Sequence, residues 1–338
     1  MANRNQRVSN KPDGLRKCFT LVPRDKKARD MSWLRRILVG ASESSWLREY
    51  APRLGFVRRA SQRFLPGETI DDAIAAARRL AGDGIASLLT HLGENVCDRS
   101  EATLVTQQYL ELIDRIHKES LDAEISVKLT QLGLDLDPEF CYENLVRLIE
   151  HSAGKMLWID MEQSQYAENT LKLYARARKT HANAGVCVQA YLRRAAQDVE
   201  ALTQLGAGVR LVKGAYNEPP EVAFANKSEV DANYFTLAQR LLSAEARKAG
   251  VRPVLATHDL KMILKITDWS AQERIAKREV EFAMLYGIQR AEQVRLARDG
   301  YRSDVLISYG TYWFPWYMRR LAERPANIFF ILRNLFLK

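Results

Sequence analysis

The chain has 338 residues, of which 47% are hydrophobic and 27% charged, a balance typical of a globular protein. This length suits one domain of about 250 residues with extensions, or two smaller domains. No run of about 18 apolar residues is present, and the start of the chain is polar and basic. The sequence therefore predicts neither a transmembrane helix nor a secretory signal.

The formal net charge is +10, and much of the excess lies near the N-terminus. Basic arms bind nucleic acid or anionic membrane surfaces, and the alternative is a solvated leader without a binding role. No recognisable nucleic-acid-binding module accompanies this arm, so we expect no nucleic-acid partner. We predict peripheral contact with the inner face of the cytoplasmic membrane instead.

The four cysteines, Cys18, Cys97, Cys141 and Cys187, are scattered and form no CxxC pair. Isolated thiols of this kind favour a reducing compartment, so a cytoplasmic location is predicted. The histidines show no ligand spacing such as HxxxH, and no protein-bound metal is expected.

Residues 1–66 are predicted to form a basic arm followed by short amphipathic helices. Pro66 and Gly67 interrupt the helical pattern, and Thr69 begins the next helix. We therefore expect a domain boundary here, with residues 67–338 forming the second and larger unit.

From residue 67 onward, short β-prone apolar runs alternate with longer stretches of helical period. The predicted strands are Ile85–His91, Ile125–Leu129, Met156–Asp160, Val186–Ala190, Val209–Val212, Pro253–Ala256, Val280–Leu285 and Val305–Ser308. The predicted helices between them are Glu101–His117, Asn144–His151, Ala167–Ala182, Ala196–Leu205, Asp231–Ala249 and Arg290–Arg298. This order favours an α/β fold, a (β/α)8 TIM-like barrel. A doubly wound open sheet is disfavoured because no GxGxxG follows the first strand.

Polar or aromatic residues follow the predicted strands, where barrel enzymes build their active sites. In chain order they are Glu94, Lys128, Asp160, Gln189, Arg210 with Lys213, Thr257 with His258, Tyr286 and Tyr309. Near the C-terminus, Arg319 and Arg320 lie on a predicted helix behind Trp313 and Trp316. Guanidinium groups bind carboxylates bidentately, so this region predicts a site for a small anionic ligand.

The motifs resemble those of the flavin-dependent proline dehydrogenases, in the small bacterial one-activity layout. The matching stretches are His91–Asn95, Ser126–Thr130, Trp158–Glu162, Val188–Tyr191, Val209–Tyr216, Ala256–Asp259, Phe282–Gly287 and Trp316–Pro325. They cover the chain from about residue 60 to its end. RLVKGAY and RRLAERP are the most specific of them.

The resemblance implies a distorted barrel with a C-terminal helix over its mouth and FAD as the cofactor. It implies oxidation of L-proline to Δ1-pyrroline-5-carboxylate, with electrons passed to a quinone. The same resemblance assigns roles to individual residues. The substrate carboxylate would be held by Lys128, Arg319 and Arg320. Tyr216 and Leu285 would form apolar walls around the substrate ring, and Glu94 would act in a gate. Asp160 and Arg210 would be catalytic, and FAD would contact Met161, Gln189, Arg210, Lys213, Gly214, Ala215, Thr257, His258 and Glu323.

One position departs from the resemblance. Leu306 stands where many family members carry a tyrosine over the proline ring. Leucine keeps an apolar wall but removes a hydroxyl and bulk, so a related 4-hydroxyproline dehydrogenase activity stays open. Another alternative is a barrel lyase that uses Lys128 or Lys213 as a Schiff-base nucleophile.

Overall fold

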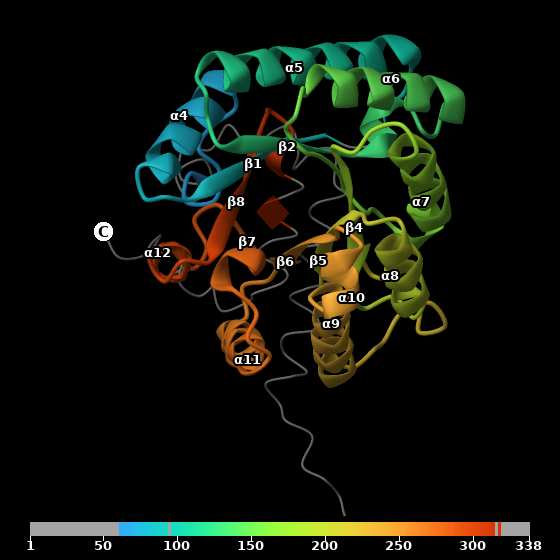
Figure 1. Ribbon diagram of the computed structural model, residues 1–338. Helices are drawn as coiled ribbons and strands as arrows, with labels where there is room; N and C mark the ends of the chain where they lie inside the picture. Colours follow the sequence, from blue (N-terminus) through green and yellow to red (C-terminus); the bar gives the residue numbers. More distant parts are fainter. Residues whose placement is uncertain (1–60, 94–95, 315–316, 319–338) are drawn as a thin grey trace, which may run out of the picture.

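The computed structural model describes residues 61–93, 96–314 and 317–318 of the chain, and these contain a closed barrel of parallel strands (Figure 1). The strands pair in sequence order, and β8 closes the barrel onto β1. They are β1 (Ala86–His91), β2 (Ala123–Val127), β3 (Leu157–Ile159), β4 (Ala184–Gln189), β5 (Gly208–Val212), β6 (Arg252–Ala256), β7 (Glu281–Leu285) and β8 (Arg302–Tyr309). The predicted (β/α)8 barrel and its order of strands are confirmed.

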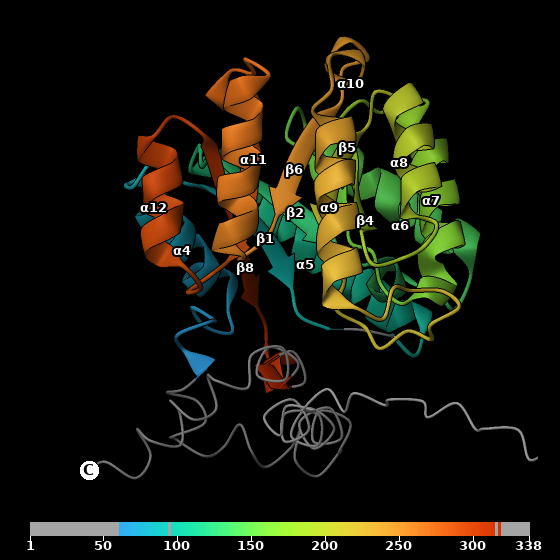
Figure 2. The same ribbon diagram turned by 90° about the horizontal axis from the view of Figure 1, so that it is seen from below.

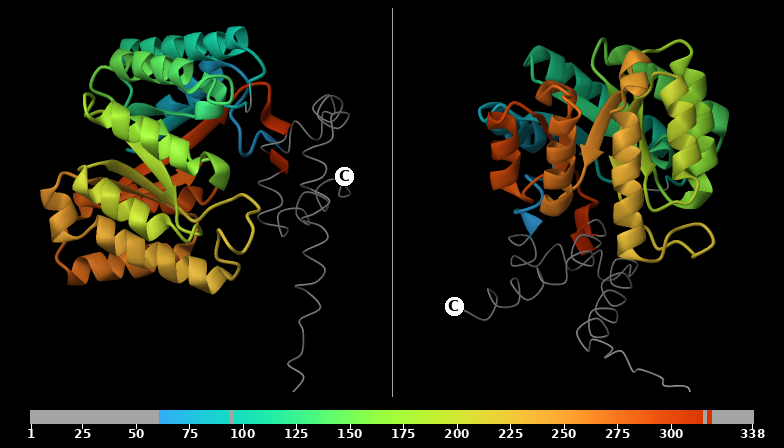
Figure 3. Two further views of the ribbon diagram at one scale, coloured as in Figure 1. Left: turned by 90° about the vertical axis from the view of Figure 1, so that its right-hand side faces the viewer. Right: turned by 60° about the horizontal axis from the view of Figure 1, so that its bottom comes forward.

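Helices surround the barrel and follow one another around it from α4 to α12 (Figures 1 and 3). They are α4 (Ile70–Ala81), α5 (Arg99–Lys118), α6 (Pro138–His151), α7 (Ser164–Arg178), α8 (Ala195–Gln204), α9 (Lys227–Leu241), α10 (Ala244–Lys248), α11 (Leu260–Gln272) and α12 (Arg290–Arg298). Short 3-10 turns are η2 (Leu129–Leu132) and η3 (Lys277–Glu279). Figure 2 shows α7 to α9, α11 and α12 from a second direction.

The predicted helix start at Thr69 is confirmed. Thr69 accepts a hydrogen bond from the Asp72 backbone N–H, and the Asp72 carboxylate accepts one from Thr69 N. This reciprocal pair is a capping box, which satisfies two of the free N–H groups at the start of a helix.

Two helix predictions need correction. The expected helix Asp231–Ala249 is split, because the Ser243 side chain accepts from Ala246 N and caps α10 as a separate helix. The sequence prediction contained no helix between β6 and β7, yet α11 lies there. Its buried residues Met262, Ile263 and Ile266 have helical spacing, which would have predicted this helix from the sequence.

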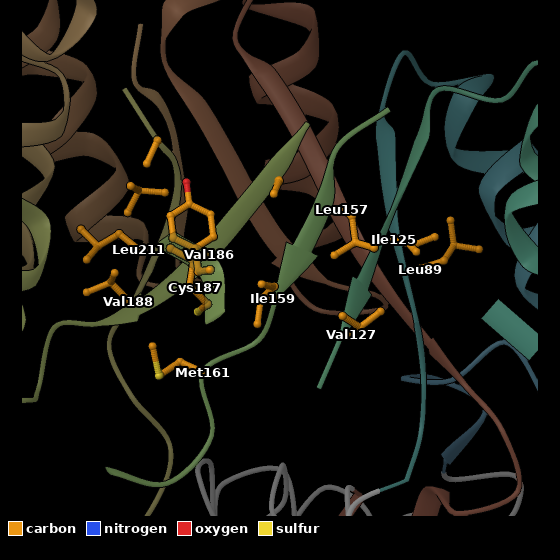
Figure 4. Packing of buried hydrophobic residues seen from close by; sticks show 14 of the residues in the cluster. Leu89, Ile125, Val127, Leu157, Ile159, Met161, Val186, Cys187, Val188 and Leu211 are labelled. Atoms are coloured by element: carbon orange, nitrogen blue, oxygen red, sulfur yellow. The ribbon is translucent and has the colours of Figure 1, made fainter. Parts of the chain in front are cut away.

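The main hydrophobic core lies between the strands and the helices outside them. Leu89, Ile125, Leu157 and Val186 come from four adjacent strands and are buried in this layer (Figure 4). Because alternate residues of a strand point to opposite faces, the residues between them project into the barrel.

The barrel interior below the mouth is filled by Trp158, which is fully buried. Space for its ring depends on Gly185, because a Cβ there would lie 2.6 Å from the indole. A Cβ on Gly208 would also lie within 3.5 Å of the ring. The indole N–H donates to Glu124 Oε2 at 2.7 Å. Trp158 therefore closes the barrel from below, and any cavity must lie above it.

Within residues 61–93, 96–314 and 317–318, none of the helices combines the length and hydropathy that a bilayer-spanning segment needs. The predicted N-terminal helices and the C-terminal helix with Arg319 and Arg320 lie outside the described residues.

Candidate active site

A cavity of about 640 Å³ opens at the C-terminal ends of the strands. Every described residue to which the motif resemblance assigned a role lines it, whereas Tyr286 and Tyr309, also expected at the strand ends, do not. The lining residues with an assigned role are Lys128, Asp160, Met161, Gln189, Arg210, Lys213, Gly214, Ala215, Tyr216, Thr257, His258 and Leu285. Glu94, Arg319, Arg320 and Glu323 lie outside the described residues. The volume falls within the range of small-molecule and cofactor sites.

The charged centre of the cavity is the ion pair between Arg210 and Asp160. Arg210 is only 4% exposed. Burial opposes its charge, but Asp160 outweighs that effect and the pKa of Arg210 lies above its ordinary value. Lys128 Nζ lies 3.7 Å from the second oxygen of Asp160. The Asp160 carboxylate thus interacts with two cations, Arg210 on β5 and Lys128 after β2.

Ser126 joins this centre, and the sequence analysis missed it. Its hydroxyl donates to Asp160 Oδ1 at 2.8 Å and accepts from Arg210 Nη2 at 2.9 Å. A signal was available, since Ser126 precedes Lys128 by two residues and must share its face of the strand. Ser126 on β2 therefore connects Asp160, which follows β3, with Arg210 on β5 through hydrogen bonds.

Two buried polar atoms on this wall have no hydrogen-bond partner among the described residues. They are Arg210 Nη1 and Gln189 Oε1. Gln189 is oriented because its amide N–H donates to Met161 O at 3.1 Å. Buried polar atoms are normally satisfied, so both indicate a ligand that presents polar atoms to this wall.

A second charged group lies at the outer edge of the cavity. Lys213 Nζ donates to Asp231 at 2.6 Å and to Asp259 at 2.8 Å. Burial raises the pKa of Asp259, but the hydrogen bond and charge of Lys213 and the charge of Lys227 outweigh it and lower that pKa to about 2. Lys213 therefore lies between two carboxylates and is ion-paired with both.

Gly214 allows the loop after β5 to pass close to the loop after β4. Its φ is +112°, and a Cβ would lie 2.2 Å from the Tyr191 ring. Tyr191 N donates to Lys213 O at 2.9 Å, which fixes this approach. Only glycine combines that φ with that contact.

Leu285 is positioned by His258. The Leu285 backbone N–H donates to His258 Nε2 at 2.8 Å, so this ring nitrogen is unprotonated. The contact joins the loop after β6 to the end of β7, and the leucine side chain lines the cavity.

The family model "Proline dehydrogenase" matches residues 73–332, most of the chain. The chain belongs to the proline dehydrogenase family. The family predicted from the motifs is thus confirmed, and so is the prediction that the chain is an enzyme.

Two relatives support the assignment over nearly their whole length. "Proline dehydrogenase 1" of Bacillus subtilis subsp. natto is 37% identical over 310 residues, which are 90% of this chain and 100% of the relative. "Proline dehydrogenase" of Deinococcus radiodurans is 34% identical over 282 residues, or 81% and 89% of the two chains.

Among solved structures, proline utilization A from Bdellovibrio bacteriovorus superposes with a TM-score of 0.74 at 24% identity. The match covers 87% of this chain and 37% of that much longer one. At this identity the likeness supports the fold alone.

Proposed function

We propose that this proline dehydrogenase binds FAD in the barrel cavity and oxidises L-proline to Δ1-pyrroline-5-carboxylate, with a quinone as electron acceptor. One observation carries the proposal within the family. Lys128 and Asp160, which follow β2 and β3, and Arg210 of β5 converge in a cavity that also contains polar atoms left unpaired by the described residues.

The residues on the β4 to β6 side of the cavity fit a flavin nucleotide. Arg210 Nη1 can donate and Gln189 Oε1 can accept, and both are buried and unused by the described residues. Gly214 brings backbone to the cavity edge, and Thr257 lies beside it on the next strand's loop. FAD, when bound, supplies the two-electron acceptor. A fixed cation beside it stabilises negative charge on the reduced ring system, and we assign that role to Arg210.

The substrate carboxylate is assigned to Lys128, together with Arg319 and Arg320 beyond the described residues. The distance of 3.7 Å between Lys128 and Asp160 is longer than a hydrogen bond. Asp160 meanwhile keeps its bonds to Ser126 and Arg210. Lys128 can therefore move to an incoming carboxylate without leaving Asp160 unpaired.

Apolar side chains are assigned to the pyrrolidine ring. Leu285 and Leu306 line the cavity from β7 and β8, and Tyr216 lines it from the loop after β5. They exclude water and hold the ring. The residues assigned to the carboxylate do not contact C5, the carbon that is oxidised. Positioning of this kind accounts for about 7–11 kcal/mol of barrier in oriented reactions.

The substrate nitrogen carries a proton that must leave during oxidation. Asp160 Oδ2 is the carboxylate oxygen facing Lys128, and Oδ1 is engaged by Ser126 and Arg210. We assign Oδ2 as the acceptor for the substrate N–H.

The purified protein tests the proposal directly. It should carry flavin absorbance that bleaches when L-proline is added without oxygen and recovers when a soluble quinone is added. A protein that takes up no FAD, or a flavin that proline leaves oxidised, would refute the proposal.

The Schiff-base alternative is disfavoured. A nucleophilic lysine must be neutral, whereas Lys213 is held between Asp231 and Asp259, and Lys128 lies against Asp160. Borohydride should therefore trap no carbonyl substrate on the protein.

Membrane contact through the basic N-terminal region remains a prediction, because that region lies outside the described residues. The full chain should sediment with anionic vesicles, and a chain beginning at Met31 should bind them less. Equal binding by both chains would contradict the assignment to residues 1–30.

A further inference from the structure

Two buried hydroxyl groups, those of Thr90 on β1 and Ser308 on β8, face the cavity and have no role in the proposed function. Thr90 is 2% exposed, Ser308 is 1% exposed, and both line the cavity. Neither hydroxyl makes a hydrogen bond to any residue that the structure describes. Because buried hydroxyls are almost always paired, two unpaired ones that face a cavity indicate a polar group of a bound ligand.

The strand register places these two residues, the hydroxyl pair, side by side. Thr90 and Ser308 are partners where β1 pairs with β8, and two residues earlier Leu88 and Leu306 are partners in the same way. The leucines also line the cavity. Since alternate residues share a face, the hydroxyl pair lies one layer nearer the C-terminal ends of the strands than the leucines. Paired strands are about 4.8 Å apart, so one small group can accept from both hydroxyls.

Thr90 also lies near the hydroxyl of Tyr109 on α5. That hydroxyl accepts from His91 N at 3.1 Å and donates to Ser126 O at 3.1 Å. A hydroxyl has a single proton, so Tyr109 has none left to donate to Thr90. The Thr90 hydroxyl is therefore available to a ligand in the cavity.

The charge of Lys128 acts at the same end of β1. Lys128 follows β2, which pairs with β1, and it lines the cavity. Burial and the charge of Lys128 lower the pKa of His91, the residue after Thr90, to about 4, so His91 is neutral at pH 7. A cation beside two neutral donors suits an anionic group of the ligand.

The position of the hydroxyl pair selects the carboxylate among the polar groups of proline. The ring nitrogen is assigned to Asp160 after β3, which lies beyond Lys128 as seen from β1. The cofactor atoms are assigned to Gln189 on β4 and Arg210 on β5, across the barrel from β8 and β1. A carboxylate has two acceptor oxygens and no proton, which matches two hydroxyl donors.

We propose that Thr90 and Ser308 donate hydrogen bonds to the carboxylate of the imino acid and bind it together with Lys128. This inference rests on the proposed function and adds to it two residues to which the motif resemblance gave no role. The hydroxyl pair contacts neither the C–H bond nor the N–H bond that breaks. It should therefore determine substrate affinity and have little effect on the rate of oxidation.

The first test is steady-state kinetics of the FAD-loaded enzyme with L-proline and an artificial electron acceptor. Thr90→Val keeps the shape of the side chain without its hydroxyl, whereas Thr90→Ser keeps the hydroxyl. Thr90→Val and Ser308→Ala should each raise KM at least about tenfold, the usual cost of one hydrogen bond to a charged group, with kcat within about threefold. Thr90→Ser should stay within about twofold of the wild type. Bound flavin per protein, measured by absorbance, should be equal in all of them.

A second ligand distinguishes the carboxylate from the ring nitrogen. Cyclopentanecarboxylate has the ring and the carboxylate but no nitrogen, so it should compete with L-proline. Its inhibition constant should rise in Thr90→Val and Ser308→Ala by the same factor as KM. A raised KM with an unchanged inhibition constant would assign the hydroxyl pair to the nitrogen and overturn the inference. If the wild type binds this analogue too weakly for a measurement, the KM comparison with Thr90→Ser decides.

Ser87→Ala and Ser303→Ala are matched controls, one on β1 and one on β8. Both serines are 2% exposed and have hydroxyls unpaired among the described residues, but neither lines the cavity. Neither substitution should change KM. Should Thr90→Val or Ser308→Ala fail to fold, the other tests the inference by itself.

A KM within about twofold of the wild type in Thr90→Val and Ser308→Ala would overturn the inference and leave the proposed function intact. An equal rise in the two controls, or a loss of bound FAD in place of a loss of proline affinity, would also overturn it. No turnover of L-proline by the FAD-loaded wild-type enzyme would instead refute the proposed function.

Discussion

At the scale of single residues, the cavity contains a carboxylate shared between two cations. Asp160 contacts Arg210 and Lys128 and is bonded to Ser126. Arg210 and Lys128 would repel each other without an anion between them, and Asp160 offsets both charges. Arg210 is buried and fixed in place. Lys128 can move more easily, because its nitrogen lies 3.7 Å from Asp160 Oδ2.

Lys128→Met should raise KM for L-proline about 10- to 100-fold with a smaller effect on kcat. A hydrogen bond to a charged group contributes roughly 1.5–3 kcal/mol, and this one is assigned to ground-state binding. Steady-state kinetics would measure it, with Lys172→Met as the control, since Lys172 pairs with Glu168 on the surface of α7. A loss confined to kcat would argue against the carboxylate assignment.

Ser126→Ala should lower kcat/KM about tenfold while the protein still binds FAD. The substitution removes a donor from Asp160 and an acceptor from Arg210, so both groups lose orientation. Ser126→Thr keeps the hydroxyl and should recover much of the activity. The control is Ser87→Ala, another buried serine that does not line the cavity. If Ser126→Ala were fully active, the serine would have no part in positioning the ion pair.

At the scale of elements, the loop between β5 and α9 is held in place by its neighbours. Phe224 N donates to Tyr191 O at 2.8 Å, and Arg193 N donates to Val222 O at 2.9 Å. Farther round the barrel, Glu218 accepts from Ser164 N and Oγ at 2.7 and 2.5 Å. Glu218 thereby caps α7, whose own N-cap residue Gln163 makes no side-chain capping bond.

Glu218→Ala should therefore affect both stability and the active site. Loss of a cap costs about 1 kcal/mol, which lowers Tm by about 2–4 °C in a protein of this class. Because the same loop carries Tyr216, KM for proline should rise by severalfold. Calorimetry and kinetics would measure the two effects. Glu221→Ala, an exposed residue of the same loop, should show neither, and a shift in Tm alone would limit Glu218 to a structural role.

At the scale of the whole molecule, an ionic network closes the N-terminal end of the barrel beneath Trp158. Arg252 donates to Glu124 at 2.6 Å and to Glu281 at 2.7 and 3.0 Å. Its guanidinium also lies 5.4 Å from the centroid of the Trp158 ring. Desolvation and the neighbouring charge of Glu281 raise the pKa of Asp304 well above its ordinary value. A protonated Asp304 can donate to Glu281.

This network predicts a pH dependence of stability. Because the pKa of Asp304 is raised on folding, its contribution is present at low pH and is lost as pH rises from about 4 through the folded-state value. Asp304→Asn stays neutral, so the Tm of the variant relative to wild type should increase with pH. Scanning calorimetry would measure this. Asp122→Asn, which removes an exposed carboxylate 3.3 Å from Arg302, is the control and should show no such trend. A flat difference for Asp304→Asn would contradict a raised pKa of Asp304 in the folded protein.

Much of the architecture could be predicted because its signals are local. Each strand is a short apolar run, and most helices have a clear helical period, although α10 was predicted as part of α9 and α11 was missed. Lys128 and Asp160 could be placed at one end of the barrel because parallel strands all present their C-terminal ends there. The motif resemblance supplied the roles of these residues, and those roles remain proposals.

The sequence by itself determined the order of elements, the barrel class and the family, since these depend on local periodicity and on motifs within single segments. Only the tertiary structure decided which interior side chains meet. The contact of Ser126 with Arg210 spans 84 residues, and the space for Trp158 depends on Gly185 and Gly208. These relations depend on the register between strands that are distant in the chain, and no single segment encodes that register.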